Sequence, residues 1–363
     1  MCQMDGGKRH WKQMRNLVNI GRSPVGPGHP VFIIAEVSAN HQQNLPRAMD
    51  TVRAAAHAGA NAVKFQTYHP DLITFNSEMA IFRIDNGTVW DGRTLHSIYS
   101  EGYMPWEWHE PLFELAASLG IEAFSSPFDP TAVDFLASLN VPAYKIASFE
   151  IVDIPLIEKV AEQGKPVIIS TGIARESDIA KAVAACHKVG NDEIIILKCT
   201  SVYPAPANEL QLRTIPDIAT RFASLVGYSD HTVTRTAALG AIALGACVLE
   251  RHITLDRETE GLDSGFSTTP EEFSGLVSDI RELELGLGRV TYDLSVAGEN
   301  SRRFSRSLFV VKDVEAGDVL TMENVRSIRP FNGMSPDMLY EVVGQKFIES
   351  LPAGTPLANH HFS

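Results

Sequence analysis

The feature that most constrains the fold of this 363-residue chain is a cycle of a short apolar run followed by a helical pattern, repeated eight times. Each apolar run ends in a cluster of polar residues. Several runs are continuously apolar, which is typical of parallel strands covered by helices. Eight such cycles predict an α/β protein, a (β/α)8 or TIM barrel, with its chemistry at the strand ends. The runs with their polar endings are Phe32–Glu36, Ala62–Gln66, Ala123–Ser126, Ala143–Ser148, Val167–Thr171, Ile194–Thr200, Ser224–His231 and Cys247–His252.

The helical patterns between these runs support the same fold. Gly59 ends the first pattern, as a glycine at a helix C-terminus does. A doubly wound parallel sheet is the structural alternative, but the chain lacks the glycine fingerprint of a dinucleotide-binding fold. The predicted helices are Leu45–Gly59, Trp108–Gly120, Thr131–Asn140, Pro155–Gly164, Ser177–Gly190, Leu210–Phe222, Thr234–Gly245 and Pro270–Gly286.

The pattern divides the chain into four segments. Residues 1–30 form an N-terminal extension and entry segment, and residues 31–290 form the catalytic barrel. Residues 291–304 are a charged linker, and residues 305–363 carry short strand-like pieces that predict a small second domain. Within the barrel, a long insertion over residues 69–105 follows the second strand, and such loops are usually functional.

Composition excludes some classes of function. The chain has 31 Lys plus Arg against 44 Asp plus Glu, a formal charge of −13, which disfavours a nucleic-acid partner. Its four cysteines show no CxxC spacing, as expected in a reducing compartment. No apolar run reaches transmembrane length. We therefore expect a soluble cytoplasmic protein without a membrane or nucleic-acid partner.

Ionisable residues at the strand ends are the candidates for chemistry. A charge buried in a barrel strand is costly unless it is paired, hydrogen-bonded or functional. Two glutamates, two lysines and two histidines occupy such positions, which predicts a functional cluster. They are Glu36, Lys64, Lys145, His231, Glu250 and His252.

His231 and His252 lie 21 residues apart, on strands that we expect to be neighbours. With Glu36 or Asp263 they make a mixed nitrogen and oxygen set suited to a divalent ion. Mn²⁺ is the first expectation, with Mg²⁺ and Co²⁺ as alternatives. The competing interpretation is a pair of hydrogen-bonded structural histidines; the position of both at strand ends favours the metal.

Lys64 and Lys145 have two interpretations. Either can form a Schiff base, as in barrel aldolases. Alternatively, both are cationic clamps for a phosphate or carboxylate. The nearby hydroxyls of Ser126, Ser148 and Ser170 favour the clamp, because a Schiff-base lysine is better served by an apolar setting.

Several of these residues stand in segments that resemble the sialic acid synthase family. The tail segment NVRSIRPFNG resembles the antifreeze-like (SAF, β-clip) domain that follows the barrel in that family. Within the family, PWEWH, SSPFDPTAVDFL and VPAYKIASFE look closest to the pseudaminic acid synthases. The likeness runs from about Gly21 to the end of the chain. The barrel segments that carry it are IAEVSANH, AVKFQTY, FSSPFD, VPAYKIASFE, STG, SVYPAP, YSDHT and LERHITLDR with GLDSGFS.

The resemblance implies a metal-dependent transferase that condenses phosphoenolpyruvate with an open-chain acetamido sugar and releases phosphate. For the pseudaminic branch the sugar is 2,4-diacetamido-2,4,6-trideoxy-L-altrose. The alternative is N-acetylneuraminate or legionaminic acid synthesis, from N-acetylmannosamine or 2,4-diacetamido-2,4,6-trideoxymannose. The resemblance also implies a domain-swapped homodimer.

Residue roles follow from the same resemblance. His231 and His252 would bind the metal, with a water between the metal and Glu36 or Asp263, the two catalytic carboxylates. Arg329 would reach the acetamido group from the partner chain. The other implied sugar-binding residues are Ser201, Asp230 and Glu250. The implied phosphoenolpyruvate-binding residues are Lys64, Gln66, Ser126, Lys145, Ser148, Ser170 and Tyr203.

Overall fold

The computed structural model describes residues 4–5, 8–9, 17–85, 87, 90–258 and 261–363. Residues 1–3, 6–7 and 10–16 of the predicted extension lie outside the described residues, as do residues 86 and 88–89 of the predicted insertion. The chain divides into two compact units, Met1–Gly288 and Arg289–Ser363.

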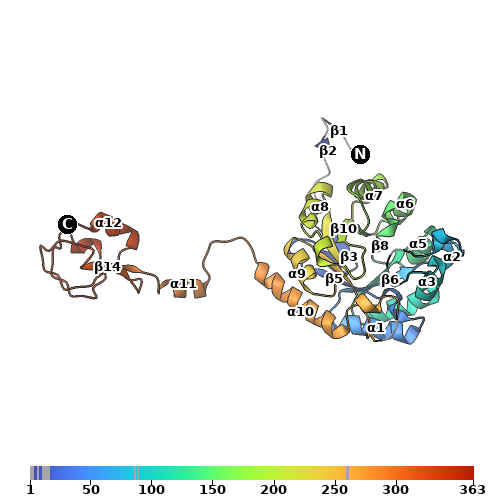
Figure 1. Ribbon diagram of the computed structural model, residues 1–363. Coiled ribbons are helices and arrows are strands. Elements are labelled where there is room, and N and C mark those ends of the chain that lie inside the picture. The colour runs from blue at the N-terminus through green and yellow to red at the C-terminus, as the bar shows by residue number, and fades with distance from the viewer. Residues whose placement is uncertain (1–3, 6–7, 10–16, 86, 88–89, 259–260) are drawn as a thin grey trace. The chain divides into compact units, whose positions relative to one another are not determined.

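Eight parallel strands close into a barrel in the first unit (Figure 1). Each strand pairs with the next one along the chain, and β12 completes the ring against β5, where His252 lies opposite Glu36. The predicted (β/α)8 fold is therefore confirmed. The strands are β5 (Phe32–Glu36), β6 (Ala62–Thr67), β7 (Glu122–Pro127), β8 (Tyr144–Ile146), β9 (Val167–Ser170), β10 (Ile194–Cys199), β11 (Leu225–Asp230) and β12 (Val248–His252).

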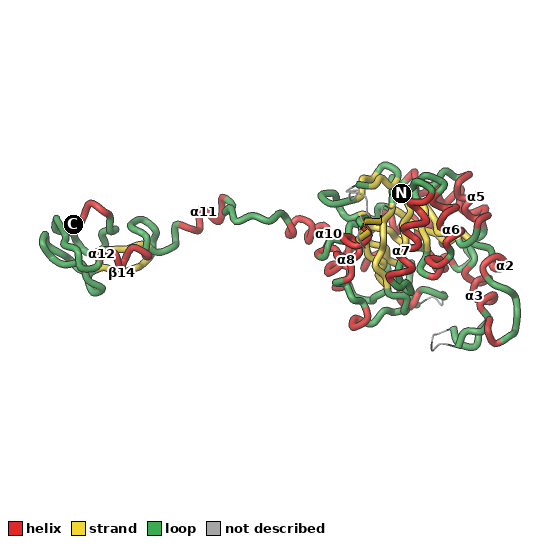
Figure 2. Tube along the Cα trace, turned by 90° about the horizontal axis from the view of Figure 1, so that it is seen from above, coloured by secondary structure: helices red, strands yellow, loops and turns green. Residues whose placement is uncertain are grey.

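Helices surround the strands on the outside of the barrel (Figure 2). In α1, Ala48, Val52 and Ala55 are buried, which places one stripe of the helix against the sheet. Side chains of Asn44, Asp129, Asp153 and Thr269 accept backbone N–H groups in the first turns of α1, α5, α6 and α10. The helices that follow the eight strands are α1 (Leu45–His57), α4 (His109–Ser118), α5 (Pro130–Ser138), α6 (Ile154–Ala161), α7 (Glu176–Lys188), α8 (Thr214–Phe222), α9 (Thr236–Ala243) and α10 (Pro270–Leu287).

The insertion between β6 and α4 contains short helices that are bonded back to the barrel. They include α2 (Pro70–Ile73) and α3 (Leu95–Gly102). Tyr68, just after β6, donates its hydroxyl to the carbonyl of Tyr99 at 3.1 Å. The indole of Trp106 donates to the carbonyl of Tyr68 at 3.1 Å and stacks on Phe135 with ring centroids 4.8 Å apart. These contacts attach both ends of the insertion to the barrel wall.

An antiparallel hairpin of β3 (Val18–Ile20) and β4 (Ser23–Val25) precedes the barrel. Val18, Ile20 and Val25 are buried in the hydrophobic core of the barrel unit. The backbone N–H of Arg22 donates to the carboxylate of Glu122, the first residue of β7, at 3.0 Å. The hairpin therefore lies at the amino end of the barrel, opposite the candidate site. Two further short strands, β1 (Met4–Asp5) and β2 (Lys8–Arg9), pair earlier in the chain.

The second unit has its own small core. Its described α-helices and strands are α11 (Val296–Arg302), the antiparallel pair β13 (Ser307–Val310) and β14 (Val325–Ile328), and the single turn α12 (Leu339–Val342). Isolated bridges such as Val314 to Leu351 join the remaining segments. The core residues are Leu308, Val310, Val314, Leu320, Val325, Val342, Phe347, Leu351 and Leu357.

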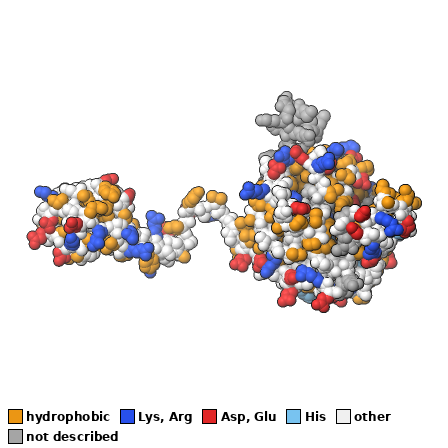
Figure 3. All heavy atoms as spheres, viewed as in Figure 1, with side chains coloured by type: hydrophobic (Ala, Val, Ile, Leu, Met, Phe, Trp, Pro, Cys, Tyr) orange, Lys and Arg blue, Asp and Glu red, His pale blue; other side chains and the backbone are white. Residues whose placement is uncertain are grey.

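The described surface is of mixed charge. On the face shown in Figure 3, acidic and basic side chains are interspersed over the barrel unit, and the described residues there form no continuous basic stripe. None of the helices in the described ranges has both the length and the apolar character required to cross a bilayer.

Candidate active site

Four buried ionisable side chains meet inside the barrel: Glu36, Lys64, Lys145 and Glu250, each at most 4% exposed. The ammonium of Lys64 lies 2.7 Å from Glu36 Oε2 and 3.8 Å from Glu250 Oε2. The ammonium of Lys145 lies 4.0 Å from Glu250 Oε1. Two cations and two carboxylates thus compensate one another, as buried charges must.

Hydroxyl groups complete the surroundings of the two lysines. Lys64 donates to the hydroxyl of Ser126 at 3.3 Å. Lys145 donates to the hydroxyl of Ser170 at 2.7 Å and to the carbonyl of Ile146 at 3.1 Å. The structure therefore brings together both lysines and two of the three serines that the sequence assigns to an anion cradle.

A chain of hydrogen bonds connects Glu36 with Asp263. The amide of Gln66 donates to Glu36 at 3.0 Å and to the hydroxyl of Ser38 at 2.9 Å. Ser38 in turn donates to Asp263 at 2.5 Å. The second glutamate of the cluster, Glu250, accepts a hydrogen bond from the hydroxyl of Ser229 at 3.0 Å.

Burial and neighbouring charges shift the pKa values of this cluster in different directions. Burial raises the pKa of Glu36 to about 7, opposed by Lys64 and assisted by Glu250. Burial alone lowers the pKa of Lys64, but Glu250 and Glu36 outweigh it and the net shift is upward. For Lys145 burial prevails over Glu250, and its pKa is lowered. Glu36 is therefore a carboxyl group able to exchange a proton near neutral pH.

His231 and His252 form an aromatic corner beside this cluster. Their ring centroids lie 5.4 Å apart. Tyr203 lies 4.4 Å from His231 and Phe266 lies 5.2 Å from His252, centroid to centroid. Burial raises the pKa of Tyr203 well above its usual range, so its hydroxyl keeps its proton.

The hydrogen bonds of the two histidines fit a metal pair. Nδ1 of His231 donates to the carbonyl of Thr200 at 2.9 Å, which leaves the lone pair of its Nε2 available. Nδ1 of His252 is buried and has no hydrogen-bond partner among the described residues. An unsatisfied buried imidazole nitrogen beside a second oriented imidazole is the arrangement that a divalent ion completes.

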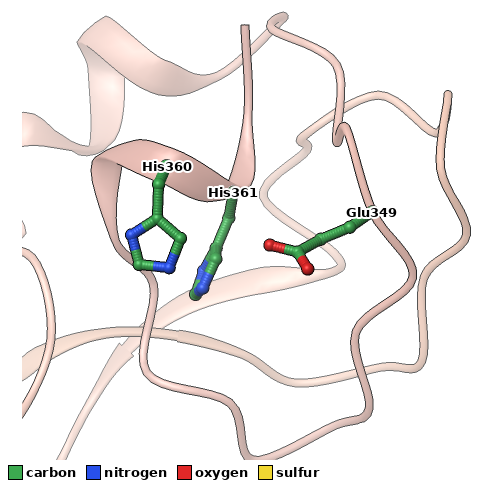
Figure 4. A group of neighbouring side chains, drawn as sticks. All are labelled: Glu349, His360 and His361. Carbon is green, nitrogen blue, oxygen red and sulfur yellow. The ribbon is translucent and has the colours of Figure 1, made fainter.

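Another histidine pair occurs in the second unit, where Glu349, His360 and His361 place donor atoms within 4.8 Å of one another (Figure 4). No other described trio of His, Cys, Asp or Glu satisfies that spacing. However, Nδ1 of His361 accepts the backbone N–H of Ala358 at 3.3 Å. A neutral ring then carries its proton on Nε2 and has no lone pair to offer there. The barrel pair is therefore the better metal candidate, with both protein ligands supplied by imidazole.

Ser148 and Ser201 lie together against the loop that follows β9. The backbone N–H of Gly172 donates to the hydroxyl of Ser148 at 3.2 Å. A Cβ on Gly172 would lie 1.9 Å from the hydroxyl oxygen of Ser201 and 2.7 Å from that of Ser148. Ser148 also donates to the Sγ of Cys199 at 3.6 Å. This group lies next to the histidine corner, because the same Sγ is 3.8 Å from Nδ1 of His231.

One sequence-predicted sugar residue, Asp230, is not brought into this site. Asp230 is buried, but its carboxylate pairs with the guanidinium of Arg251 at 2.6 Å. Successive strand residues face opposite sides, so Asp230 faces away from the interior that Ser229 and His231 share. Arg329 follows β14 in the second unit, where it is exposed and pairs with no described residue.

Three functional neighbours were missed by the sequence analysis. Ser38 and Ser229 hold carboxylates of the site, and Cys199 faces His231. Ser229 stands two residues before His231, so the two side chains lie on the same face. The strand period alone therefore predicts that Ser229 faces the site. Cys199 lies in an apolar run, where no local pattern distinguishes a functional thiol from a small hydrophobic residue.

Comparison with known proteins places these residues in a family context. Residues 51–292 match the NeuB family and residues 305–363 match the SAF domain, which confirms the predicted resemblance and the second-domain fold. The pseudaminic acid synthase of Helicobacter pylori is 41% identical over 91% of this chain and 97% of its own. The N,N'-diacetyllegionaminic acid synthase of Legionella pneumophila is 36% identical, over 94% and 97%.

A solved structure shows the same fold. The N-acetylneuraminic acid synthetase of Leptospira borgpetersenii, crystallised with citrate, superposes with a TM-score of 0.71 at 29% identity. The match covers 80% of this chain and 96% of that chain.

Proposed function

The chain belongs to the NeuB family, and from that premise we propose that it condenses phosphoenolpyruvate with 2,4-diacetamido-2,4,6-trideoxy-L-altrose and releases phosphate. The observation that carries this proposal is the buried cluster of Lys64, Lys145, Glu36 and Glu250 beside the histidine pair. The cluster provides two cations, Lys64 and Lys145, for an acidic substrate, and a carboxyl group, Glu36, whose pKa is about 7. The sequence identity of 41% to the pseudaminic acid synthase of Helicobacter pylori supports the choice of sugar.

Phosphoenolpyruvate is held by charge and hydroxyl groups in this proposal. Lys64 and Lys145 neutralise its phosphate and carboxylate, and charge-assisted hydrogen bonds of this kind are short and strong. Ser126 and Ser170 already bond the two ammonium groups and keep them extended toward the substrate. Ser148, Gln66 and Tyr203 line the same region. With phosphoenolpyruvate bound, Lys64 and Lys145 interact both with its anionic groups and with the carboxylates of Glu36 and Glu250.

The reaction joins C3 of phosphoenolpyruvate to the aldehyde carbon of the open-chain sugar. The π electrons of the enol form the new bond, the aldehyde oxygen takes a proton from solvent water, and positive charge develops at C2; the proton that Glu36 later accepts returns to solvent. The Glu36 carboxylate stabilises that charge and accepts a proton from the water that adds to C2. The tetrahedral intermediate then expels phosphate by C–O cleavage and leaves a 2-keto acid, while Lys64 and Lys145 stabilise the departing phosphate.

His231 and His252 would hold a divalent ion, Mn²⁺ first and Mg²⁺ or Co²⁺ as alternatives. When bound, such an ion supplies Lewis-acid polarisation of the sugar carbonyl. Tyr203 and Phe266 pack against the two imidazoles and restrict their rotation. The Thr200 carbonyl fixes which nitrogen of His231 faces the site.

The sugar side is completed in this proposal by Ser201, Glu250 and Arg329. Arg329 comes from the partner chain of a domain-swapped homodimer and contacts an acetamido group. Its support is that an exposed guanidinium without a described partner is available for a ligand. A cytoplasmic location, where cysteines stay reduced, is also part of the proposal.

Isotope transfer tests the reaction. Phosphoenolpyruvate labelled with ¹⁸O at the bridging oxygen is incubated with the purified full chain, Mn²⁺ and the altrose derivative. C–O cleavage predicts that the label leaves in phosphate. Label retained in the keto acid would show P–O cleavage and contradict the proposal.

The Schiff-base alternative is tested at Lys145, whose pKa is lowered by burial. The clamp predicts that Lys145→Met raises KM for phosphoenolpyruvate by about tenfold or more, since a hydrogen bond to a charged group contributes about 1.5–3 kcal/mol. Residual turnover stays sensitive to EDTA. Borohydride trapping of wild-type chain with pyruvate, together with EDTA-resistant activity, would instead establish the Schiff-base class.

A further inference from the structure

A buried ion pair lies on the outer face of the two strands that carry the histidines. Asp230 ends β11 and Arg251 lies opposite it on β12. Their side chains are 0% and 3% exposed, and the guanidinium lies 2.6 Å from the carboxylate. His231 directly follows the end of β11, His252 is the last residue of β12, and both imidazoles face the interior. The ion pair therefore directly precedes both histidines, on the opposite face of the chain.

One guanidinium holds the backbone around both histidines. Besides Asp230, Arg251 donates to the carbonyls of Thr232 at 2.8 Å and Thr234 at 2.9 Å. Asp230 also accepts the backbone N–H of Thr232 at 2.9 Å, so the residues on both sides of His231 are held.

The bonds on the His252 side involve Thr268. Arg251 donates through Nε to the hydroxyl of Thr268 at 2.6 Å. The backbone N–H of Thr268 donates to the carbonyl of His252 at 2.9 Å. The same guanidinium is therefore bonded on one side to the segment that carries His231 and on the other to the residue behind His252.

We propose that the Asp230–Arg251 pair is a positioning device that fixes the spacing of His231 and His252 for a divalent ion. This inference rests on the proposed function of the two histidines. Its residues touch neither substrate nor metal; they act through the backbone of the two strand ends.

Energetics favour a positional role over a stabilising one. A buried ion pair pays a large desolvation penalty, and well-packed apolar residues at the same position are often as stabilising. Arginine satisfies four acceptors here in one rigid planar group, which lysine cannot do. A cavity of about 700 Å³, lined in part by Thr234 and Thr268, borders Arg251. Hydrogen bonds rather than dense packing therefore hold the guanidinium on that side.

The positioning role is tested by measuring the affinity of the full chain for Mn²⁺, a measurement that does not depend on turnover. The chain is stripped with EDTA and titrated with Mn²⁺, and free Mn²⁺ is followed by electron paramagnetic resonance. Arg251→Lys is expected to weaken binding by about 10–100-fold, the usual effect of removing an outer-shell partner of a metal ligand. Asp230→Asn and Thr268→Val are expected to weaken it in the same direction.

Arg235→Gln is the matched control. Arg235 borders the same cavity and pairs with Asp279 at 2.8 Å, but both side chains are partly exposed and neither bonds a histidine-bearing strand. Its Mn²⁺ affinity is expected to match wild type. Circular dichroism checks that each variant is folded, and Thr268→Val, which keeps the ion pair, serves if Arg251→Lys does not fold.

Two outcomes separate this inference from the proposed function. Folded variants of Arg251, Asp230 and Thr268 that bind Mn²⁺ as wild type does would overturn the positioning role alone. A wild-type chain whose Mn²⁺ binding is absent, or survives His231→Ala, would overturn the metal assignment and the positioning role with it.

Discussion

Glu36 combines burial, a cationic partner and a neighbouring carboxylate. It is 1% exposed, 2.7 Å from the Lys64 ammonium and close to Glu250 through that same ammonium. Burial dominates, and the pKa of Glu36 rises to about 7. Its surroundings therefore convert an ordinary carboxyl group into one that changes charge within the physiological range.

This pKa predicts the pH profile of the reaction. Because the proposed role needs the carboxylate, kcat/KM is expected to rise with pH and level off above about 7. Glu250 raises the pKa of Glu36, so Glu250→Gln is expected to move this limb to lower pH in the activity that remains. The pH profiles of the wild-type chain and of Glu250→Gln are measured by steady-state phosphate release between about pH 5 and pH 9.

Glu150 provides the control for that profile. Burial also raises its pKa to about 7, but its carboxylate has no assigned role in the reaction. Glu150→Gln is expected to keep the acid limb in place. If the rise of kcat/KM with pH disappears in Glu150→Gln, the group that titrates is Glu150, and the role of Glu36 is contradicted.

At the scale of elements, the loop after β9 is the tightest part of the site. Gly172 has no side chain, and the hydroxyls of Ser148 and Ser201 fill the space that a Cβ would take. The loop thus brings a serine assigned to phosphoenolpyruvate into contact with one assigned to the sugar. Close packing of this kind makes the loop sensitive to a single methyl group.

Gly172→Ala is therefore expected to lower kcat/KM by about 10²-fold, because a displacement of about 1 Å is enough for such a loss. The effect is steric, since the backbone of Gly172 does not adopt a positive φ. Gly286→Ala in α10, where a Cβ meets no atom within 4 Å, is the control and keeps wild-type activity. Wild-type kinetics in Gly172→Ala would show that the serines do not line the substrate.

The strand period explains which site residues were predictable. Lys64 and Gln66 are two residues apart, share a face and both reach Glu36. The family resemblance implies a sugar role for Asp230, but its neighbour His231 occupies the inner face and Asp230 pairs with Arg251. The Ser38–Asp263 bond joins residues 225 positions apart, and no local pattern specifies such a contact.

Local patterns also explain which elements were recovered. The eight strands follow from the repeated apolar runs, several of them continuous, which is typical of a parallel sheet covered by helices. The β3–β4 hairpin was missed, because each strand has three residues and the segment is rich in glycine and proline. Its burial depends on contact with β7 at the amino end of the barrel.

At the scale of the whole molecule, the chain has two units with separate cores. The barrel unit carries the lysines, glutamates and histidines, and the second unit carries Arg329. The proposed exchange of Arg329 between partner chains makes the smallest active species a dimer.

Mixing two inactive chains tests that exchange. His231→Ala inactivates a barrel, and Arg329→Ala removes the proposed sugar contact. Unfolding and refolding an equal mixture is expected to restore about one quarter of wild-type activity, because half of random dimers are mixed and each has one intact site. No recovery, with dimers present by light scattering, would place Arg329 in its own chain's site or outside any site.

Phosphate release from phosphoenolpyruvate with Mn²⁺ and each of three sugars tests both the proposed reaction and the choice of sugar. The sugars are 2,4-diacetamido-2,4,6-trideoxy-L-altrose, 2,4-diacetamido-2,4,6-trideoxymannose and N-acetylmannosamine. Sugar-dependent release is expected with the altrose derivative, with a far lower kcat/KM for the other two sugars. Release with N-acetylmannosamine alone, or with none of the three, would contradict the proposed function.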